Sequence, residues 1–468
     1  MADLRPRINT RTNVLTSLIA PAGARNAAML CTATWGPINE VKIITSTSNF
    51  VEVFGNDKEG DDITGIKGAD NFFANGGTLK VVRLDDGTAA ESSLVLQNST
   101  TDVITLTAAY KGTEGDNISV VVSAIDTTNR GVKITYGSQI ESYTNGGVGF
   151  DANEDIVAAI NSTSNLVTAA VETGQETSNL VDVTTATYLD NGADGETGLA
   201  TSDYVTAYEN LLVTENFNFL LLPGITNDSA HASFASLLET RAAIEKRYSR
   251  LIAGVAKDET IATMVARTTS SRRCSLVAPS IKYTHRATNE QTILNGSYLA
   301  CAYAGMLCGT ERQVSGTHNN VVVEGLVVNE ASGKEYYNKA EQSEILAAKV
   351  IPITEVSGQV QAVRGITRNA STTEVWFEEV VVDIIDYVRE QSETYLNSVI
   401  GKPNTADNRT IYAARLDSIL QTIKDEGIIE DFNESAVVAG ASPDTINATL
   451  NVKPAYNTNF VNLTINVQ

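Results

Sequence analysis

The stretch Met29-Leu30-Cys31-Thr32-Ala33-Thr34-Trp35-Gly36-Pro37 decides how this chain is interpreted, because an apolar strand candidate runs directly into a Gly-Pro turn. Further signals follow at short intervals, and they are Phe54-Gly55, Phe72-Phe73-Ala74-Asn75-Gly76-Gly77 and Lys80-Val81-Val82-Arg83-Leu84. Gly-Pro and Asn-Gly-Gly mark turns, since glycine tolerates positive φ and proline fixes φ. Strand and helix signals therefore alternate from Ala28 to Leu84, which predicts the first part of an α/β core.

The same alternation resumes after Thr201. An apolar run at 217–222 is closed by Pro223-Gly224, and residues 229–248 place apolar side chains on one helical face. Residues 251–256 and 274–278 are again strand-like. Strands separated by helices of this length pair in parallel through right-handed crossovers. The sequence thus predicts a largely parallel α/β core whose two parts are separated along the chain.

The segment from Gly87 to Leu199 differs in composition from the residues on either side. It holds fifteen acidic and three basic residues, and its Thr, Val, Asn and Gly content suits short strands and turns. Its entry is Tyr110-Lys111-Gly112-Thr113-Glu114-Gly115-Asp116-Asn117, and its exit is the turn cluster Leu189-Asp190-Asn191-Gly192-Ala193-Asp194-Gly195. We expect a separately folded, solvent-facing, β-rich domain. Taken alone, these turn residues favour a generic β-rich insertion with glycine loops.

Length, charge and cysteine usage limit the class of protein. The chain has 468 residues, of which 42% are hydrophobic and 19% charged, as in globular proteins of two or three domains. A formal net charge of −22 makes neutralisation of a phosphate backbone unfavourable, so we expect no nucleic-acid partner. Four cysteines in apolar runs are expected to be buried, reduced thiols, and they are Cys31, Cys274, Cys301 and Cys308.

No apolar signal segment follows the N-terminus, and the uncharged run 291–309 lacks the apolar density of a membrane span.

Catalytic and metal-binding patterns do not stand out. The chain has three histidines, which are His231, His285 and His318. None has a second ligand at metal-binding spacing, and neither a phosphate loop nor a nucleophile elbow occurs. The acids near the exit of the insertion are Asp190, Asp194 and Glu196. They match a calcium loop only loosely, because Gly192 stands where an oxygen ligand is needed. We predict no enzyme activity, no cofactor and no metal site; a perturbed carboxylate pair in a deep pocket would revive an enzyme.

The two ends of the chain have different patterns. Apolar residues at the C-terminus alternate strictly with Asn462, Thr464 and Asn466, and they are Val461, Leu463, Ile465 and Val467. This period of two predicts a strand with one buried face, which must find a sheet edge. The strand could fold back on its own domain or insert into a neighbouring subunit. The first twenty residues read as an extended arm with scattered apolar side chains, and these are Ile8, Val14, Leu15 and Leu18. Such an arm favours exchange between subunits.

The order and spacing of these segments resemble those of contractile phage tail sheath proteins. In that family a strand ends at a Gly-Pro turn, a helix leads to a Phe-Gly pair, and a second helix ends at Asn-Gly-Gly before a strand bearing an arginine. Here the arginine is Arg83. The entry and exit of the insertion, Leu222-Pro223-Gly224 and the run Val363-Arg364-Gly365-Ile366-Thr367 are similar as well. The N-terminus differs from the family in lacking the Pro-Gly-Val-Tyr opening common in sheaths.

The resemblance implies a mixed, largely parallel α/β core that is discontinuous in sequence, with an inserted β-rich domain and extended N- and C-terminal arms. The expected parts are an N-terminal arm, the first part of the core, the inserted domain, the second part of the core with C-terminal helices, and a C-terminal strand arm. Their bounds are 1–20, 21–86, 87–199, 200–453 and 454–468.

The implied function is structural. The chain would be a subunit of a contractile tail sheath that polymerises as hexameric rings stacked helically around an inner tube. Contraction through subunit rearrangement would drive the tube through the host envelope. The partners would be other copies, the tube protein, and baseplate and tail terminator proteins. The location would be the virion tail, after assembly in the host cytoplasm.

A helix predicted at 408–426 is the candidate contact with the tube. Its apolar face is expected to be Ile411, Leu416, Ile419, Leu420 and Ile423. Its possible outward contacts are basic, and they are Arg409, Arg415 and Lys424.

Two alternatives stay open at this point. The first is the sheath of a phage-derived bacteriocin or injection system, which sequence does not separate from a virion. The second is an acidic ligand-binding or adhesin-like surface protein whose inserted domain holds a ligand. That alternative needs a secretion route and predicts a discrete monomer.

Overall fold

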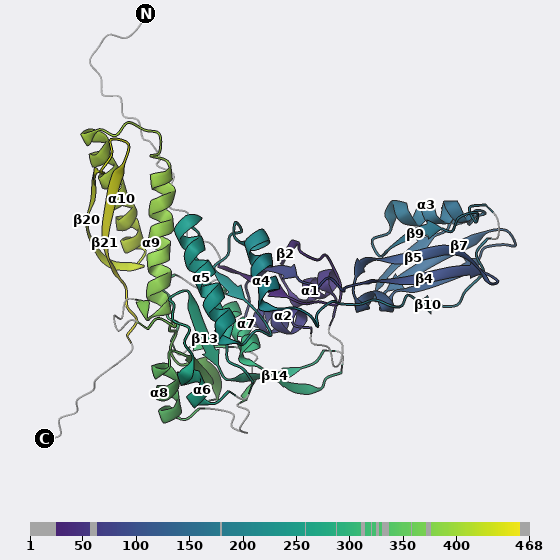
Figure 1. Ribbon diagram of the computed structural model, residues 1–468, viewed down its shortest axis with the longest axis horizontal. Coiled ribbons are helices and arrows are strands. Elements are labelled where there is room, and N and C mark those ends of the chain that lie inside the picture. The colour runs from purple at the N-terminus through teal and green to yellow at the C-terminus, as the bar shows by residue number, and fades with distance from the viewer. Residues whose placement is uncertain are drawn as a thin grey trace, which may run out of the picture. The chain divides into compact units, whose positions relative to one another are not determined.

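The computed structural model describes residues 25–56, 63–177, 180–257, 259–286, 288–309, 314–319, 321–323, 327–329, 337–356, 358–370 and 376–458 (Figure 1). The contacts divide the chain into two units. Residues 24–312 and 318–379 form one, here called the α/β unit. Residues 313–317 and 380–468 belong to the other, here called the C-terminal unit. The domain bounds expected from the sequence stay predictions.

A largely parallel sheet lies at the centre of the α/β unit. Its parallel strands lie in the order β3 (Thr78–Arg83), β1 (Asn26–Cys31), β11 (Phe219–Leu221), β12 (Arg250–Gly254), β13 (Cys274–Ala278) and β18 (Ile351–Val356). Antiparallel strands flank it, namely β2 (Val41–Ile44) beside β3, and β19 (Gln359–Ala362) followed by β16 (Val321–Val322) beside β18. The chain order reverses between β1 and β11, as in doubly wound folds. The prediction of a discontinuous, largely parallel α/β core is confirmed.

Helices cover both faces of this sheet (Figure 1). Helices α1 (Thr47–Phe54), α2 (Gly65–Phe73) and α7 (Gly296–Leu307) pack on one face. On the other lie α4 (Thr201–Ala207), the π-helical turn η3 (Tyr208–Leu212), α5 (Asp228–Ile244), α6 (Ile261–Ala266) and α8 (Lys339–Ala347). Successive residues of β1 alternate between the faces, since Met29 packs with the first set and Leu30 with the second.

Helix α7 occupies the run that the sequence left without charge, and every one of its residues is buried. Beside it, β14 (Ser280–Thr284) pairs antiparallel with β15 (Gln291–Leu294) and β17 (Val327–Asn329). Among the described helices, none combines the length and apolar character needed to cross a membrane.

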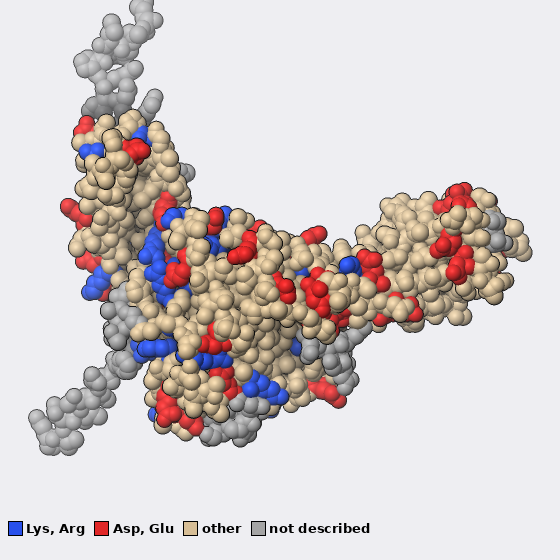
Figure 2. All heavy atoms as spheres, in the orientation of Figure 1, with Lys and Arg blue, Asp and Glu red and all other residues tan. Residues whose placement is uncertain are grey.

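The inserted domain is built from two antiparallel sheets. One contains β4 (Glu91–Asn98), β5 (Thr101–Lys111) and β9 (Val167–Val171), and the other contains β10 (Thr187–Tyr188), β6 (Ser119–Ala124), β7 (Arg130–Tyr136) and β8 (Gln139–Tyr143). Helix α3 (Asn153–Thr163) and the 3-10 turns η1 (Thr113–Asn117) and η2 (Asn145–Gly147) complete it. Acidic side chains are visible on its surface in Figure 2, where basic ones are scarce. The predicted β-rich insertion is confirmed.

The C-terminal unit contains α9 (Glu379–Asn397), which begins one residue before the unit, α10 (Ala406–Asp425), β20 (Ile429–Ala439) and β21 (Ile446–Pro454). Leu416, Ile419, Leu420 and Ile423 are buried, as predicted for α10. Ile411 is 61% exposed, so its predicted place on the apolar face is wrong. At 100° per residue Ile411 lies roughly 140° around the helix from Leu416. The sequence analysis did not predict the β20–β21 hairpin.

Candidate assembly surfaces and the residues that anchor them

The β20–β21 hairpin is the first candidate assembly surface. The two strands pair only with each other among the described residues, so both outer edges carry backbone groups without a strand partner there. One face packs against α10, because Phe432, Leu450 and Val452 join the apolar core of this unit. Along β21 half-buried and exposed residues alternate without interruption until Pro454. A two-stranded ribbon with open edges is a template for a further strand.

The two edges of this hairpin are not equivalent. Strand β20 has register irregularities between Ile429 and Asp431 and between Asn433 and Ala436. At the second irregularity the Ser435 amide donates to the Asp417 carboxylate at 2.7 Å rather than to a strand. Because bulges interrupt pairing, the regular edge of β21 is the better acceptor for a strand.

The predicted strand and arm residues lie outside the described part of the chain. This holds for Val461, Leu463, Ile465 and Val467 at the C-terminus. It also holds for Ile8, Val14, Leu15 and Leu18 at the N-terminus.

The basic residues predicted to meet the tube lie on α10 and are all half-buried. Arg409 donates to the Asn404 side-chain oxygen at 2.7 Å. Lys424 donates to Asp431 at 2.7 Å. Arg415 lies near Tyr395. Burial raises the pKa of the Tyr395 phenol, and the Arg415 charge offsets part of that rise. Two of the three cations therefore already have partners within the chain.

The junction of the inserted domain is organised around Arg83, at the end of β3. This side chain is completely buried. Its Nη1 atom donates to the Gly36 carbonyl at 2.9 Å and to the Lys111 carbonyl at 2.7 Å, and its Nη2 atom donates to the Asp194 carbonyl at 3.3 Å. One guanidinium thus joins the Gly-Pro turn of the core to both ends of the insertion. The sequence analysis noted this arginine but gave it no role.

Trp35 extends the core into the inserted domain. It is 4% exposed and belongs to the apolar cluster of the insertion rather than to that of the sheet. Its ring meets Tyr110 edge-on at 5.3 Å and stacks on Tyr136 at 6.1 Å between centroids. The Glu114 amide donates to the Thr34 carbonyl at 3.1 Å. Apolar burial and backbone pairing therefore both cross this junction.

Glycines at the entry and exit allow the backbones to meet. Gly112 has φ +130°, and a Cβ atom there would lie 2.0 Å from the Thr34 carbonyl oxygen. A Cβ atom on Gly192 would lie 2.4 Å from the Gly112 carbonyl oxygen. No side chain fits at either contact. These glycines are therefore needed for close packing at the junction, and they do more than provide the turns of a generic insertion.

The acids at this junction are used as hydrogen-bond acceptors. Asp194 accepts from the Thr113 amide at 2.7 Å and the Thr113 hydroxyl at 2.8 Å. Asp116 accepts from the Ser92 hydroxyl at 2.7 Å and the Gly192 amide at 3.0 Å. Within the described residues no group of His, Cys, Asp or Glu has the arrangement of a metal site.

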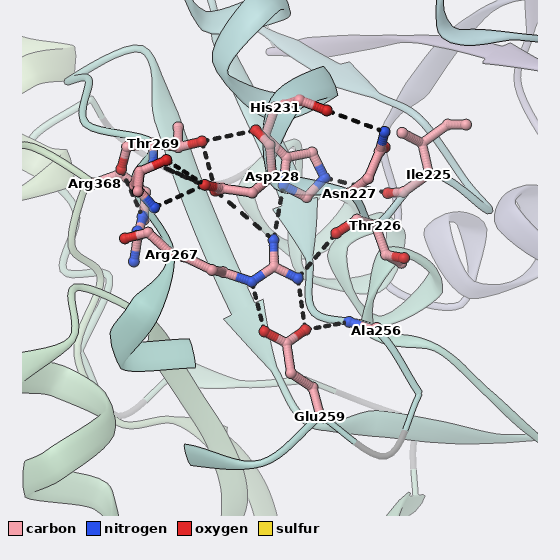
Figure 3. A network of polar contacts seen from close by, with 12 residues as sticks. Ile225, Thr226, Asn227, Asp228, His231, Ala256, Glu259, Arg267, Thr269 and Arg368 are labelled. Carbon is pink, nitrogen blue, oxygen red and sulfur yellow. Dashed lines mark hydrogen bonds and ion pairs between the residues drawn. The ribbon is translucent and has the colours of Figure 1, made fainter. Parts of the chain in front are cut away.

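A polar network fastens the loops around α5 and α6 (Figure 3). Arg267 donates from Nε and Nη2 to the two carboxylate oxygens of Glu259 at 2.6 and 2.5 Å, and from Nη2 to the Thr226 carbonyl at 2.9 Å. Asp228 accepts from the Thr269 hydroxyl at 2.6 Å. Burial acts to raise the pKa of Asp228, but hydrogen bonds from Thr269 and Thr268 lower it to about 2.

His231 lies inside this network with only 1% of its surface exposed. Its Nε2 atom is 3.3 Å from the Ile225 carbonyl oxygen, and its Nδ1 atom is 3.4 Å from Arg267. Burial, reinforced by the Arg267 charge, lowers the pKa of His231 to about 4. The ring is therefore neutral at physiological pH and has a packing role.

A second network surrounds Glu379, the last residue of the α/β unit before the chain enters the C-terminal unit. The carboxylate is completely buried. Its Oε2 atom accepts from the Tyr303 hydroxyl at 2.6 Å and lies 2.9 Å from His318 Nδ1, while Arg250 Nε lies 3.5 Å from Oε1. Burial would raise the pKa of Glu379, yet the Arg250 charge and the His318 hydrogen bond hold it below its usual range.

The crevice in which doubly wound folds bind ligands is filled here. It lies where the strand order reverses, at the carboxyl ends of β1 and β11. The Thr32 amide donates to the Thr64 hydroxyl at 3.1 Å, and the Thr64 amide donates back to the Thr32 hydroxyl at 3.0 Å. Pro223 lies against Gly68, where a Cβ atom would be 3.2 Å away. Side chains and backbone of the chain itself occupy this place.

A surface cleft of about 740 Å³ lies between α6 and α8. Its walls include Ile261, Val265 and Ala347. Arg368 is another lining residue, and its guanidinium donates to the carbonyls of Thr269 and Ala348. The guanidinium is therefore already hydrogen-bonded to backbone carbonyls of residues that line the cleft.

Three comparisons with known proteins give a consistent result. The family model for the phage tail sheath C-terminal domain matches residues 371–468. The tail sheath protein of Vibrio phage KVP40 is 26% identical in an alignment of 229 residues that covers 46% of this chain. The match spans 33% of that relative's length.

Solved sheath structures share the fold over nearly the whole chain. The sheath tail protein of Desulfitobacterium hafniense has a TM-score of 0.67 at 15% identity, with 96% of this chain and 100% of that chain covered. The sheath tail protein Lin1278 of Listeria innocua has a TM-score of 0.65 at 14% identity, with 93% of each chain covered. The contracted helical sheath of the anti-feeding prophage gives 0.55 at 12% identity, with 100% and 99% covered. At these identities the likeness establishes the fold.

Proposed function

This chain resembles the sheath proteins of contractile tails in sequence and in fold, and we propose that it is a structural subunit of such a sheath. Copies polymerise into hexameric rings that stack helically around an inner tube. The observation that carries the proposal is the β20–β21 hairpin, an open two-stranded ribbon in the region that matches the sheath C-terminal model.

Strand addition at this hairpin links the copies. The C-terminal strand with Val461, Leu463, Ile465 and Val467 pairs with the regular edge of β21 in a neighbouring copy. Its four alternating apolar residues match the alternation of Ile446, Ala448, Leu450 and Val452, so one apolar face continues across the new sheet. The N-terminal arm, with Ile8, Val14, Leu15 and Leu18, takes part in the same linkage.

The mechanism is mechanical. An extended array assembled on the tube relaxes to a shorter and wider one in which copies bury more surface against each other. A change of state needs a difference in free energy between the states, and about 25 cal/mol per Å² of buried apolar surface supplies it. The subunit performs this step without enzyme chemistry, cofactor or nucleotide.

The remaining partners follow from the same proposal. They are the tube protein, the baseplate and the tail terminator. The subunit is assembled in the host cytoplasm and ends in a virion tail or in a phage-derived particle. Solved structures of the anti-feeding prophage and of an extracellular contractile injection system are of the second kind. The alternative of a ligand-binding surface protein is not favoured, because relatives and neighbours are sheath proteins.

Helix α10 is the proposed contact with the tube. Among Arg409, Arg415 and Lys424, the first and last bind Asn404 and Asp431, so Arg415 is the best placed to take an external partner. Arg415→Glu is expected to abolish co-assembly with the tube protein while self-association persists. Unchanged co-assembly would remove α10 from the contact.

Electron microscopy of the purified chain tests the central proposal. The full chain is expected to form striated tubes, and a version that ends at Tyr456 is expected to remain dispersed. Leu463→Asp places a charge on the apolar face of the C-terminal strand and should also prevent tubes. Asn462→Asp makes a similar change on the opposite face and should not. Dispersed monomers from every version would refute unaided self-assembly.

A further inference from the structure

Two of the points at which the chain passes between its units meet at one buried group. The chain enters the α/β unit at His318, directly after residues 313–317, and leaves it at Glu379, directly before α9 continues into the C-terminal unit. These residues are 61 positions apart, yet His318 Nδ1 is 2.9 Å from Glu379 Oε2. Both side chains are completely buried. The hydrogen bond therefore ties together two segments that lead to the same unit.

The rest of the network holds this pair within the α/β unit. Tyr303, on the buried helix α7, donates its hydroxyl to Glu379 Oε2 at 2.6 Å. Arg250, at the start of β12, places Nε 3.5 Å from Oε1 and donates from Nη1 to the Glu379 carbonyl at 3.4 Å. A carboxylate can only accept hydrogen bonds, so Tyr303 and His318 both act as donors. Groups from a central strand and a central helix thus converge on Glu379.

The backbone before α9 is pinned as well. The Glu379 amide donates to the Gly365 carbonyl at 3.2 Å, and the Thr367 amide donates to the Phe377 carbonyl at 2.8 Å. A Cβ atom on Gly365 would lie 2.4 Å from the His318 Cβ and 2.8 Å from Glu379 Oε2. Glycine in the run Val363-Arg364-Gly365-Ile366-Thr367 is therefore required for the network to close.

We propose that Glu379, His318, Tyr303 and Arg250 form a clamp that holds together, at one point of the α/β unit, two of the segments through which the chain passes to the C-terminal unit: the one that ends at His318 and the one that begins at Glu379. A buried carboxylate without its partners is strongly disfavoured, and so is a buried guanidinium without its carboxylate. The clamp is accordingly either complete or open, with few stable states between. When it opens, the two segments are released from the α/β unit while its sheet stays folded.

Native-state proteolysis of the full-length chain tests the clamp. Thermolysin cleaves before apolar residues, so Val314 and Val380 report on the two segments. Glu379→Gln is expected to raise the rate of cleavage at these positions at least tenfold over the unchanged chain, as mapped by mass spectrometry. Hydrogen exchange of peptides covering 314–319 and 376–384 should rise, whereas peptides from β1 and β11 should keep their protection.

His231→Gln is the matched control. It changes another buried histidine of the α/β unit that lies in a separate network. It is expected to lower overall stability without selective cleavage at the two segments. Equal protection of the segments in Glu379→Gln and the unchanged chain would overturn the clamp. Cleavage that increases evenly over the whole α/β unit would overturn it too.

Two further variants serve if Glu379→Gln fails to fold. Tyr303→Phe removes one donor and keeps the ring, and Gly365→Ala removes only the space that the network needs. Both should give the same local pattern, at smaller amplitude for Tyr303→Phe, and its absence in both would refute the clamp. Because no readout requires polymerisation, the clamp can hold even if the proposed sheath function fails, and the reverse is equally detectable.

Discussion

Arg83 and Glu379 are both completely buried charges beside a place where the α/β core gives way to another part of the chain, but their partners differ. Arg83 donates to three backbone carbonyls, from Gly36, Lys111 and Asp194. Glu379 accepts from the side chains of Tyr303 and His318 and faces Arg250. The first junction is fixed through the backbone and reinforced by Trp35 and close glycine contacts. The second depends on one carboxylate, so it can open as a unit.

Among changes at the two junctions, removal of the Arg83 guanidinium should cause the largest loss of stability. Arg83→Met leaves three carbonyls without their donor in a buried place, and each orphaned group costs about 1 to 3 kcal/mol. We expect the free energy of unfolding to fall by about 5 kcal/mol in urea titrations. Exchange protection should be lost first at η1 and at residues 190–195. Loss of protection at 376–384 instead would mean that the two junctions are not independent.

A methyl group at Gly112 should act almost as strongly. Gly112→Ala forces a Cβ atom against the Thr34 carbonyl and an alanine into positive φ, which we expect to cost about 4 kcal/mol. Gly137→Ala is the matched control, because Gly137 also has positive φ but has nothing within 4 Å of its Cβ position. It should cost only about 1 kcal/mol. Equal costs would show that backbone strain alone, and not close packing, requires the glycine.

Acid should weaken the α/β unit in two steps, and the buried ring of His231 in the network around α5 and α6 gives the first step. Above pH 6.5 His231 is neutral in both states. Between pH 6.5 and about 4 the unfolded chain takes up a proton on this residue and the folded chain does not. Stability should therefore fall by about 3 kcal/mol over this range in urea titrations, and His231→Gln should remove the fall.

The clamp should respond at lower pH. The folded pKa of Glu379 is depressed, so its contribution is present above about pH 4.3 and is lost as the pH falls through the folded value. Cleavage at 314 and 380 by an acid-active protease should increase in this range before cleavage within the insertion does. The opposite order would contradict the contrast between the junctions.

The smallest expected effect concerns one hydroxyl. Thr113→Val removes the hydrogen bond to Asp194 at 2.8 Å but keeps the amide bond to the same carboxylate. We expect a loss of about 1 kcal/mol, measured by thermal unfolding, because one donor remains. Asp194→Asn should cost more, since both contacts weaken.

The sequence was sufficient to predict the helices and strands that have a continuous apolar run or a regular apolar period. β13 begins and ends where the apolar run 274–278 predicted, and the four buried apolar residues of α10 from Leu416 to Ile423 follow the helical period. The hairpin was missed because β20 carries acids and two irregularities that break the period of two. Ile411 was misplaced because apolar character alone does not say which stripe of a helix is covered.

The anchoring residues could not be predicted from the sequence for a different reason. Arg83 meets Asp194 across 111 positions, and Tyr303 meets Glu379 across 76. Residues so far apart form no recognisable sequence motif. In the sequence alone, a charged residue that will be buried cannot be told from one that will lie on the surface. Gly365 was the one available indication of the Glu379 network, because a glycine between larger residues can mark a place where other groups approach the backbone closely.

The four cysteines have a practical consequence for observing motion. All are free and buried, and burial raises the pKa of each thiol, to about 12 for Cys274. Thiolates are the reactive form, so the natural chain is nearly inert to maleimide dyes. A single cysteine introduced at an exposed position, such as Tyr188 of the inserted domain, would be the one site that takes a label. Distances between labelled copies could then be used to test for the proposed contraction without first removing any native residue.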